Sequence, residues 1–264
     1  QDYWKYSGIE RDVYLYARPQ SRVRDFRMTA ELVNDYKDGE LNLDVLLHQP
    51  KVGESVEVKV LDKGKEIYNR KKSITSITDT LFSQQEIFPN IRAWNAETPN
   101  TYTLVVSTFD AQGKPLESFT HLFGFRTVEM RNGMQMINGK AVLFKGVNRH
   151  EHDPHKGRTI SVASMIHDIQ LMKFNLNGVR NCHYPNYSAW YELCTEFGLY
   201  MVDEANIESH GMMDHKDGTL ANYPDWELPF MERMSRMIAR DRNYSAIVTW
   251  SMGNESGYGK HFET

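Results

Sequence analysis

The sequence predicts a multidomain β plus α/β chain, in which an immunoglobulin-like β-sandwich is followed by the first half of a (β/α)8 TIM barrel. Three observations support this prediction. Short apolar runs that alternate with polar residues fill positions 21–127, whereas strand-like and helix-like stretches alternate along positions 128–264. In the second region, each of the four predicted strands also runs into a group of polar residues, as expected at one end of such a barrel.

The first twenty residues contain one alternating run, at positions 13–16, which ends before Pro19. A strand needs a partner, and residues 1–20 offer it none. We therefore interpret residues 1–20 as the C-terminal end of an upstream β-domain, with its last strand at 13–16.

Residues 21–127 have the two-residue periodicity of half-buried strands. Glycines at positions 39, 64 and 113 mark predicted hairpin turns. The predicted strands lie at 26–32, 41–47, 56–61, 66–70, 81–87, 102–109 and 118–125. Seven short strands in about a hundred residues are typical of an immunoglobulin-like sandwich, to which we assign a spacing and packing role.

Residues 128–264 predict repeated strand–helix units, which form a parallel sheet covered by helices. Ser188 is the predicted N-cap of the second helix, and Gly198 its left-handed C-cap. The predicted strands lie at 142–147, 178–182, 199–202 and from Ala246 onward, with helices at 161–174, from Ser188 and at about 227–242. A closed barrel needs eight strands, so we expect this chain to be a segment of a larger protein.

The composition argues against nucleic acid and membrane partners. The net charge is −4, and lysine and arginine are scattered rather than clustered on a basic face. The chain contains neither a signal sequence nor a run that could span a bilayer, and its compartment, cytoplasmic or periplasmic, is left open because it does not start with methionine. Cys182 and Cys194 fit no metal or redox spacing, so we interpret both as free, buried thiols.

Polar residues follow each predicted strand of the parallel sheet, where they outline a pocket. The four groups are Asn148, Arg149, His150, Glu151, His152 and Asp153; His183, Tyr184 and Asn186; Asp203, Glu204, Asn206, Glu208 and His210; and Asn254 and Glu255. The sequence has neither a Gly-x-Ser-x-Gly elbow nor a phosphate-binding glycine loop. Carboxylates, histidines, asparagines and aromatic residues instead suit a pocket that cleaves a glycosidic bond, and Glu255, just after the Gly253 turn, is the candidate acid.

A metal site is a second interpretation of the same residues. Glu208 and His210 would point the same way from an extended segment, and with Glu255 they would suit Mg²⁺ or Mn²⁺, with zinc as an alternative. On spacing alone, a surface acid and a hydrogen-bonded loop histidine are the favoured interpretation. The histidine tract at 150–155 could also be a metal site. The favoured interpretation is that one histidine faces the pocket and the others are solvated.

Several blocks of sequence resemble glycoside hydrolase family 2, and within it the large bacterial β-galactosidases. The blocks lie at 123–129, 145–152, 179–186, 202–211 and 250–257, and residues 94–99 with Tyr102 fit the sandwich domain of that family. The resemblance implies three parts: the C-terminal end of a jelly-roll sugar-binding domain at 1–20, the sandwich at 21–127, and the truncated barrel at 128–264. It also implies a retaining enzyme that cleaves terminal β-D-galactosides.

The resemblance also implies a role for individual residues. Glu255 would be the general acid/base, and Asn254 would bond the 2-hydroxyl of the sugar. His150 and His183 would contact the galactosyl group, and Asp2 would bind galactose hydroxyls. A magnesium ion would be bound by Glu208, His210 and Glu255. The nucleophilic glutamate would lie beyond Thr264, so we expect the segment alone to be inactive. A sodium site would be incomplete in this segment. We also expect the full-length protein to be a homo-oligomer.

Three alternatives remain beside this interpretation. The first is a β-glucuronidase or β-mannosidase of the same family. The second is a non-catalytic carbohydrate-binding scaffold that retains half a barrel. The third is a hydrolase that uses a metal at Glu208 and His210 directly, for which chelation would abolish activity completely.

Overall fold

The computed structural model describes residues 8–213 and 218–263. The chain divides into two compact units: Val13–Val142, which we call the sandwich unit, and Leu143–Thr264 with Gln1–Asp12, which we call the parallel-sheet unit. The domain boundaries proposed from the sequence, after residues 20 and 127, stay predictions.

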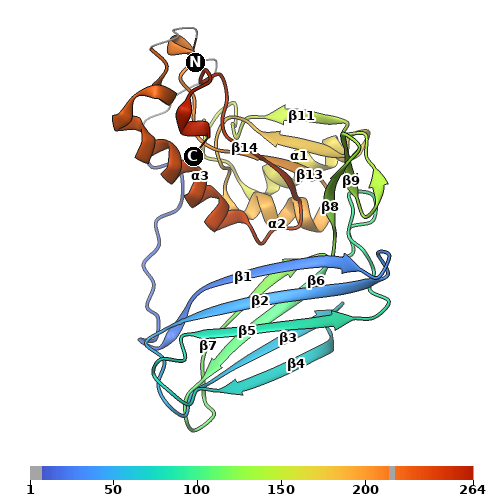
Figure 1. Cartoon of the computed structure of the whole chain (residues 1–264), viewed down its shortest axis with the longest axis vertical. Helices are drawn as coiled ribbons and strands as arrows, with labels where there is room; N and C mark the ends of the chain where they lie inside the picture. The colour runs from blue at the N-terminus through green and yellow to red at the C-terminus, as the bar shows by residue number, and fades with distance from the viewer. Residues whose placement is uncertain (1–7, 214–217, 264) are drawn as a thin grey trace. The chain divides into compact units, whose positions relative to one another are not determined.

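The sandwich unit contains two antiparallel sheets, and each of the seven predicted strands forms (Figure 1). One sheet has the order β1-β2-β5, with bounds Arg22–Val33, Asp38–His48 and Leu81–Phe88. The other has the order β4-β3-β6-β7, with bounds Lys65–Ser73, Ser55–Asp62, Tyr102–Phe109 and Pro115–Phe123.

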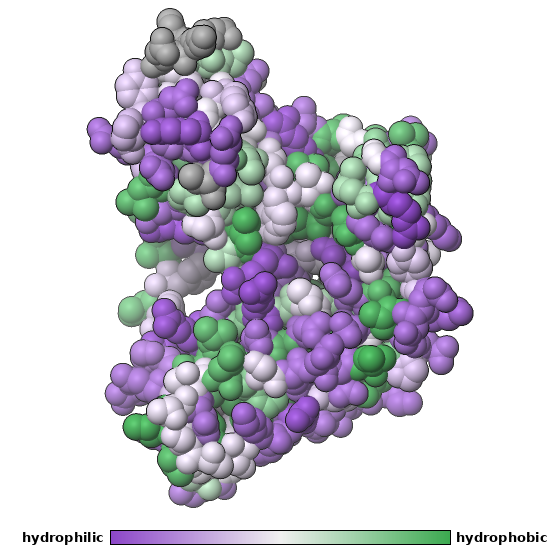
Figure 2. Space-filling model, viewed as in Figure 1, coloured by the Kyte–Doolittle hydropathy of each residue, from purple (hydrophilic) through white to green (hydrophobic). Residues whose placement is uncertain are grey.

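Alternate residues of both sheets fill one hydrophobic core. Leu41, Leu43 and Val45 of β2 are buried at every second position, and Val58 and Val60 of β3 are buried in the same cluster. Burying each such side chain contributes about 1.5–3 kcal/mol to the hydrophobic driving force. Much of the outer surface in Figure 2 is hydrophilic, with hydrophobic residues scattered over it, as the alternation requires.

A small third sheet completes the sandwich unit, and the sequence analysis did not predict it. Its strands, in the order β10-β9-β8, are Lys140–Ala141, Met134–Ile137 and Val128–Arg131. The turns between them are Asn-Gly pairs with positive φ at both residues: 51° and 75° at Asn132 and Gly133, and 52° and 74° at Asn138 and Gly139. This dipeptide is a strong hairpin signal, which the interpretation of residues 128–141 overlooked.

The strand predicted at positions 13–16 does not form. Val13, Leu15 and Tyr16 are 79%, 103% and 77% exposed, and residues 12–19 belong to no sheet in the part of the chain that the structure describes. An alternating segment forms a strand only when another strand pairs with it. None of the described strands pairs with residues 13–16.

The parallel-sheet unit confirms the predicted half barrel. Its four strands lie in sequence order, and every neighbouring pair is parallel. They are β11 (Gly146–Arg149), β12 (Gly178–Asn181), β13 (Tyr200–Glu204) and β14 (Ile247–Ser251), with helices α1 (Val162–Lys173), α2 (Ser188–Phe197) and α3 (Glu227–Asp241) between them (Figure 1). The first strand begins at Gly146 rather than at residue 142.

The helix ends agree with the sequence except at one position. Ser161 caps α1 by accepting the Ser164 N–H at 3.2 Å, and Gly198 ends α2 at a φ of 80°. Ser188 is not the cap of α2 but its first residue; Tyr187 stands at the N-cap without a side-chain bond to the helix. The Tyr187 N–H instead donates to Glu151 Oε1 at 2.9 Å, which fixes the entry to the helix.

Four short 3-10 turns connect the described parts of the C-terminal loops. They are η1 (His210–Met212), η2 (Leu220–Asn222), η3 (Pro224–Trp226) and η4 (Lys260–Phe262). Within 8–213 and 218–263, every helix is too short or too polar to cross a membrane.

Candidate active site

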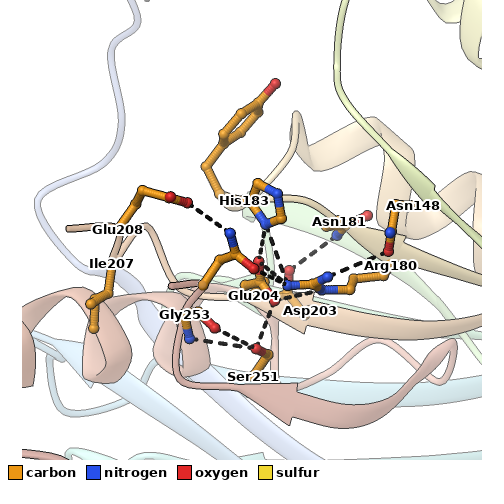
Figure 3. A network of polar contacts seen from close by, with 12 residues as sticks. Asn148, Arg180, Asn181, His183, Asp203, Glu204, Ile207, Glu208, Ser251 and Gly253 are labelled. Carbon is orange, nitrogen blue, oxygen red and sulfur yellow. Dashed lines mark hydrogen bonds and ion pairs between the residues drawn. The ribbon is translucent and has the colours of Figure 1, made fainter. Parts of the chain in front are cut away.

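The predicted site residues that the structure describes gather at the carboxyl edge of β11 to β14. Parallel neighbouring strands end on the same side of a sheet, so the segments that follow them come together there. Figure 3 shows this edge, with Arg180, His183, Glu204 and Glu208 directed into one polar network.

Glu204 is at the centre of the network. Its buried carboxylate accepts hydrogen bonds from Arg180 Nε at 2.7 Å and Nη2 at 3.0 Å, and from Ser251 Oγ at 2.7 Å. His183 Nδ1 lies 2.7 Å from Glu204 Oε1. Arg180 Nη2, which only donates, lies farther from the same nitrogen, at 3.3 Å. Because the shorter contact is with a carboxylate, which accepts, we assign the proton to His183 Nδ1, which leaves the lone pair on Nε2. Glu204 therefore joins β12, β13 and β14 through one side chain.

Asn254 connects this network to the next segment. Its Oδ1 accepts from Arg180 Nη2 at 3.0 Å, and its Nδ2 donates to Glu208 Oε2 at 3.0 Å. Both ends of the amide are thus oriented by charged side chains.

Gly253 sets the position of Asn254. Its φ is 133°, and a Cβ there would lie 2.4 Å from the Ile207 carbonyl oxygen, so only glycine fits. The next N–H, that of Asn254, donates to the same oxygen at 2.9 Å. The predicted sharp turn after β14 is confirmed.

Glu208, His210 and Glu255 lie together, as the sequence analysis predicted for a metal site. One donor atom from each lies within 4.8 Å of the others, and His210 Nδ1 contacts the Glu255 carboxylate. Among the described residues, the buried Glu208 Oε1 has no hydrogen-bond donor. Two carboxylates and an imidazole, with one carboxylate oxygen unsatisfied, fit a hard divalent cation such as Mg²⁺ or Mn²⁺.

His150 and His183 also lie together. Their ring centroids are 5.3 Å apart in an edge-to-face arrangement, with His183 buried and His150 exposed. The rest of the histidine tract forms a turn, in which Asp153 accepts the backbone N–H groups of His155 and Lys156 at 2.8 and 2.9 Å. These bonds, that of His155 first, lower the pKa of Asp153. Asp2, the remaining predicted site residue, lies outside the described residues.

A second polar network lies beneath the edge and was not predicted as a unit. Asp203 and Asp241 are fully buried, and Asp203 Oδ1 accepts from Tyr191 Oη at 2.8 Å and Asn181 Nδ2 at 3.1 Å. Burial, with the Asp241 charge as the next cause, raises the pKa of Asp203 to about 7. Burial also raises the pKa of Asp241, against the lowering effect of its bonds from Arg240. This network packs α2 and α3 against the sheet.

Sequence reasoning missed the role of Arg180 and Ser251 in the site. Arg180 was part of a resemblance block, and an arginine inside a short strand of a covered sheet is a signal of an internal ion pair. Ser251 also lies in a resemblance block, but a serine at the end of a strand does not indicate a contact with Glu204, 47 positions away.

Family models match almost the whole chain. Residues 21–126 match the model of glycosyl hydrolases family 2, and residues 128–264 match the model of the TIM barrel domain of glycosyl hydrolases family 2.

The chain is similar to β-galactosidases in sequence and to a β-glucuronidase in structure. The β-galactosidases of Pseudoalteromonas haloplanktis and Priestia megaterium are 43% and 41% identical to this chain over its full length, and the chain spans 26% and 27% of theirs. The structure of Bifidobacterium dentium β-glucuronidase complexed with coumarin-3-O-glucuronide superposes with a TM-score of 0.77 at 27% identity, covering 89% of this chain and 38% of that one.

Proposed function

Because this chain belongs to family 2 of the glycosyl hydrolases, we propose that the full-length protein is a retaining β-galactosidase acting on terminal β-D-galactosides. The main support is the level of identity: 43% to a β-galactosidase across the whole chain, against 27% to a β-glucuronidase. The chain spans only about a quarter of the length of that β-galactosidase, so the activity is assigned to the complete protein.

Glu255 is the proposed general acid/base. A retaining enzyme needs one carboxyl group that protonates the leaving oxygen and a second, about 5–5.5 Å away, that attacks the anomeric carbon. Glu255 follows the Gly253 turn at the carboxyl edge, and its side chain is 35% exposed and thus accessible to a substrate. It would donate its proton as the glycosidic bond breaks and later take one from the attacking water. The nucleophile is assigned to the region beyond Thr264.

The neighbouring side chains are suited to hold the sugar. Arg180 and Glu208 orient the Asn254 amide, whose second N–H would reach the 2-hydroxyl. The Glu204 carboxylate keeps the His183 proton on Nδ1, so His183 Nε2 would accept a hydrogen bond from a galactosyl hydroxyl, beside His150.

Glu208, His210 and Glu255 would hold Mg²⁺, or Mn²⁺ in its place. When bound, the ion would supply positive charge that positions the Glu255 carboxyl group and satisfies Glu208 Oε1. Glu208 also orients Asn254, so these side chains link the ion site to the proposed sugar contact. We assign a sodium ion, if present, to a site completed outside this chain, and we propose a homo-oligomer for the full-length protein.

Hydrolysis of three aryl glycosides by the full-length protein tests this proposal. We expect the aryl β-galactoside to be preferred over the β-glucuronide and β-mannoside by about 100-fold or more in kcat/KM, since the polar site discriminates between hydroxyl patterns. Proton NMR of the first-formed sugar should show retained β configuration. Preference for the glucuronide or mannoside would contradict the substrate, and no hydrolysis of any would support the non-catalytic scaffold.

A further inference from the structure

We propose that His150, Cys182 and His183 form a second metal site, selective for zinc, and that zinc bound there excludes the sugar. One donor atom of each residue lies within 4.8 Å of the other two. The three residues follow β11 and β12 at the carboxyl edge of the sheet, on segments separate from those of Glu208, His210 and Glu255.

The hydrogen bonding of His183 prepares it as a metal ligand. Histidines that bind zinc commonly donate their other ring N–H to a carboxylate, which fixes the tautomer and raises the basicity of the binding nitrogen. His183 has this partner in Glu204, at 2.7 Å, and Glu204 is itself held by two bonds from Arg180. Glu204 and Arg180 therefore both hold the His183 ring at Nδ1 before any ion arrives (Figure 3). The assigned tautomer leaves Nε2 as the binding nitrogen.

The donor set distinguishes this cluster from the predicted magnesium site. Two imidazoles and a thiolate are borderline-soft donors, which prefer zinc, whereas two carboxylates and one imidazole suit a hard cation. Three protein ligands also leave a fourth position of a tetrahedral zinc open to solvent or substrate. The donor atoms of this cluster therefore favour zinc, whereas those of Glu208, His210 and Glu255 favour magnesium.

The required movement is small and falls on the exposed residue. Zinc bonds of about 2.0–2.3 Å place tetrahedral donor atoms about 3.3–3.8 Å apart, so a cluster spread over up to 4.8 Å must contract. Cys182 and His183 are 0% and 6% exposed and held by the strand end, whereas His150 is exposed and can close on an ion from the solvent side.

The effect on the sugar rests on the proposed function. His150 and His183 are the side chains proposed to contact the galactosyl group, so an ion between them occupies the position of the sugar. We therefore expect micromolar zinc to inhibit galactoside hydrolysis competitively, and added Mg²⁺ not to relieve the inhibition.

Cobalt(II), a spectroscopic substitute for zinc, tests the site directly. The full-length protein, kept in saturating Mg²⁺, is titrated with cobalt chloride while the near-ultraviolet thiolate-to-cobalt charge-transfer band is recorded. We expect the band in the unmodified protein and its loss in Cys182→Ser. Cys194→Ser is the matched control, because Cys194 is the other buried thiol and burial raises the pKa of its thiol; it should keep the band and the activity. A missing band in the unmodified protein, or a band that survives in Cys182→Ser, overturns the proposal.

A second variant covers the case in which Cys182→Ser does not fold. His150→Gln changes an exposed ligand, and we expect it to weaken cobalt binding at least about tenfold by calorimetry; unchanged affinity overturns the site. The band does not depend on galactosidase activity, so failure of the proposed function leaves this test intact. If the band forms but zinc leaves galactoside hydrolysis unchanged, the site stands and the exclusion of sugar is wrong.

Discussion

Asn254 donates its amide hydrogen to Glu208 Oε2 at 3.0 Å, and the two residues also form an isolated parallel backbone bridge. This double connection joins the segment after β14 to the segment after β13. The proposed sugar contact and the proposed cation ligand are therefore parts of one rigid unit, and a change to either side chain should affect the other.

The link between Asn254 and Glu208 predicts that Asn254→Ala weakens magnesium binding without touching a ligand. A hydrogen bond to a charged group contributes about 1.5–3 kcal/mol, so we expect the magnesium affinity to fall about 10- to 100-fold. Isothermal titration calorimetry of the metal-free full-length protein with MgCl₂ measures this magnesium affinity. Asn206→Ala, at an exposed position of the same loop, is the control and should bind magnesium normally. Equal affinities in both variants would refute the coupling.

Glu255→Ala in the full-length protein tests the acid/base assignment. Loss of a general acid costs about 10²- to 10⁴-fold in turnover, so a loss in this range is expected. Sodium azide should restore part of the rate by attacking the glycosyl intermediate, and the product should be β-galactosyl azide. Glu263→Ala, a nearby exposed carboxylate, should behave as the unmodified protein. A small loss of turnover without azide rescue would show that another group is the acid.

Removal of the divalent ion distinguishes a positioning role from direct catalysis. If the ion only positions Glu255, EDTA treatment should lower kcat partially, and Glu208→Gln should lower both the activity and its response to added Mg²⁺. Glu232→Gln, an exposed change on α3, should respond to Mg²⁺ normally. Complete and reversible loss of activity on chelation would instead favour the hydrolase that uses the metal directly.

The buried Asp203 predicts a stability change with pH. Its pKa is raised to about 7 in the fold, from 3.8 when exposed. Between about pH 4 and about pH 7 the unfolded chain has lost this proton and the folded chain retains it, so the free energy of unfolding falls as pH rises and levels off above about 7. One pKa unit corresponds to about 1.4 kcal/mol, so a fall of the order of 2–4 kcal/mol is expected.

Asp203→Asn should flatten this dependence, since the amide keeps the acceptor for Tyr191 and has no proton to lose. Thermal unfolding of the full-length protein across this pH range measures the slope, and Asp225→Asn, exposed in η3, should retain it. An unchanged slope in Asp203→Asn would assign the pH dependence to other groups.

The sequence predicted those features that depend on local periodicity. The sandwich strands follow from alternation, as at Leu41, Leu43 and Val45, where every second residue enters the core. Glu208, His210 and Glu255 could be grouped because they follow two strands of one predicted parallel sheet, whose ends meet. The strand at 13–16 does not form, because alternation supplies only one half of a ladder and no described strand pairs with it.

The remaining features depend on contacts between distant positions. Arg180, Glu204 and Asn254 come from three different segments, and only the register of the sheet places them within hydrogen-bond distance. The pairing of Asp203 with Asp241 likewise requires α3 to pack against β13. Residue type can indicate that a side chain such as Arg180 has an internal partner, but it does not state which distant residue that partner is.

Main-chain crowding at Gly253 limits how the proposed acid can move. Gly253 leaves no room for a Cβ beside the Ile207 carbonyl, and the Asn254 N–H bonds to the same oxygen, so the main chain holds the segment that carries Glu255 close to residue 207. The turn itself does not restrict torsion about the side-chain bonds of Glu255, whose carboxylate is 35% exposed and contacts His210. This torsion is the degree of freedom required by a group that first gives up a proton on one side of a bond and then receives another from water.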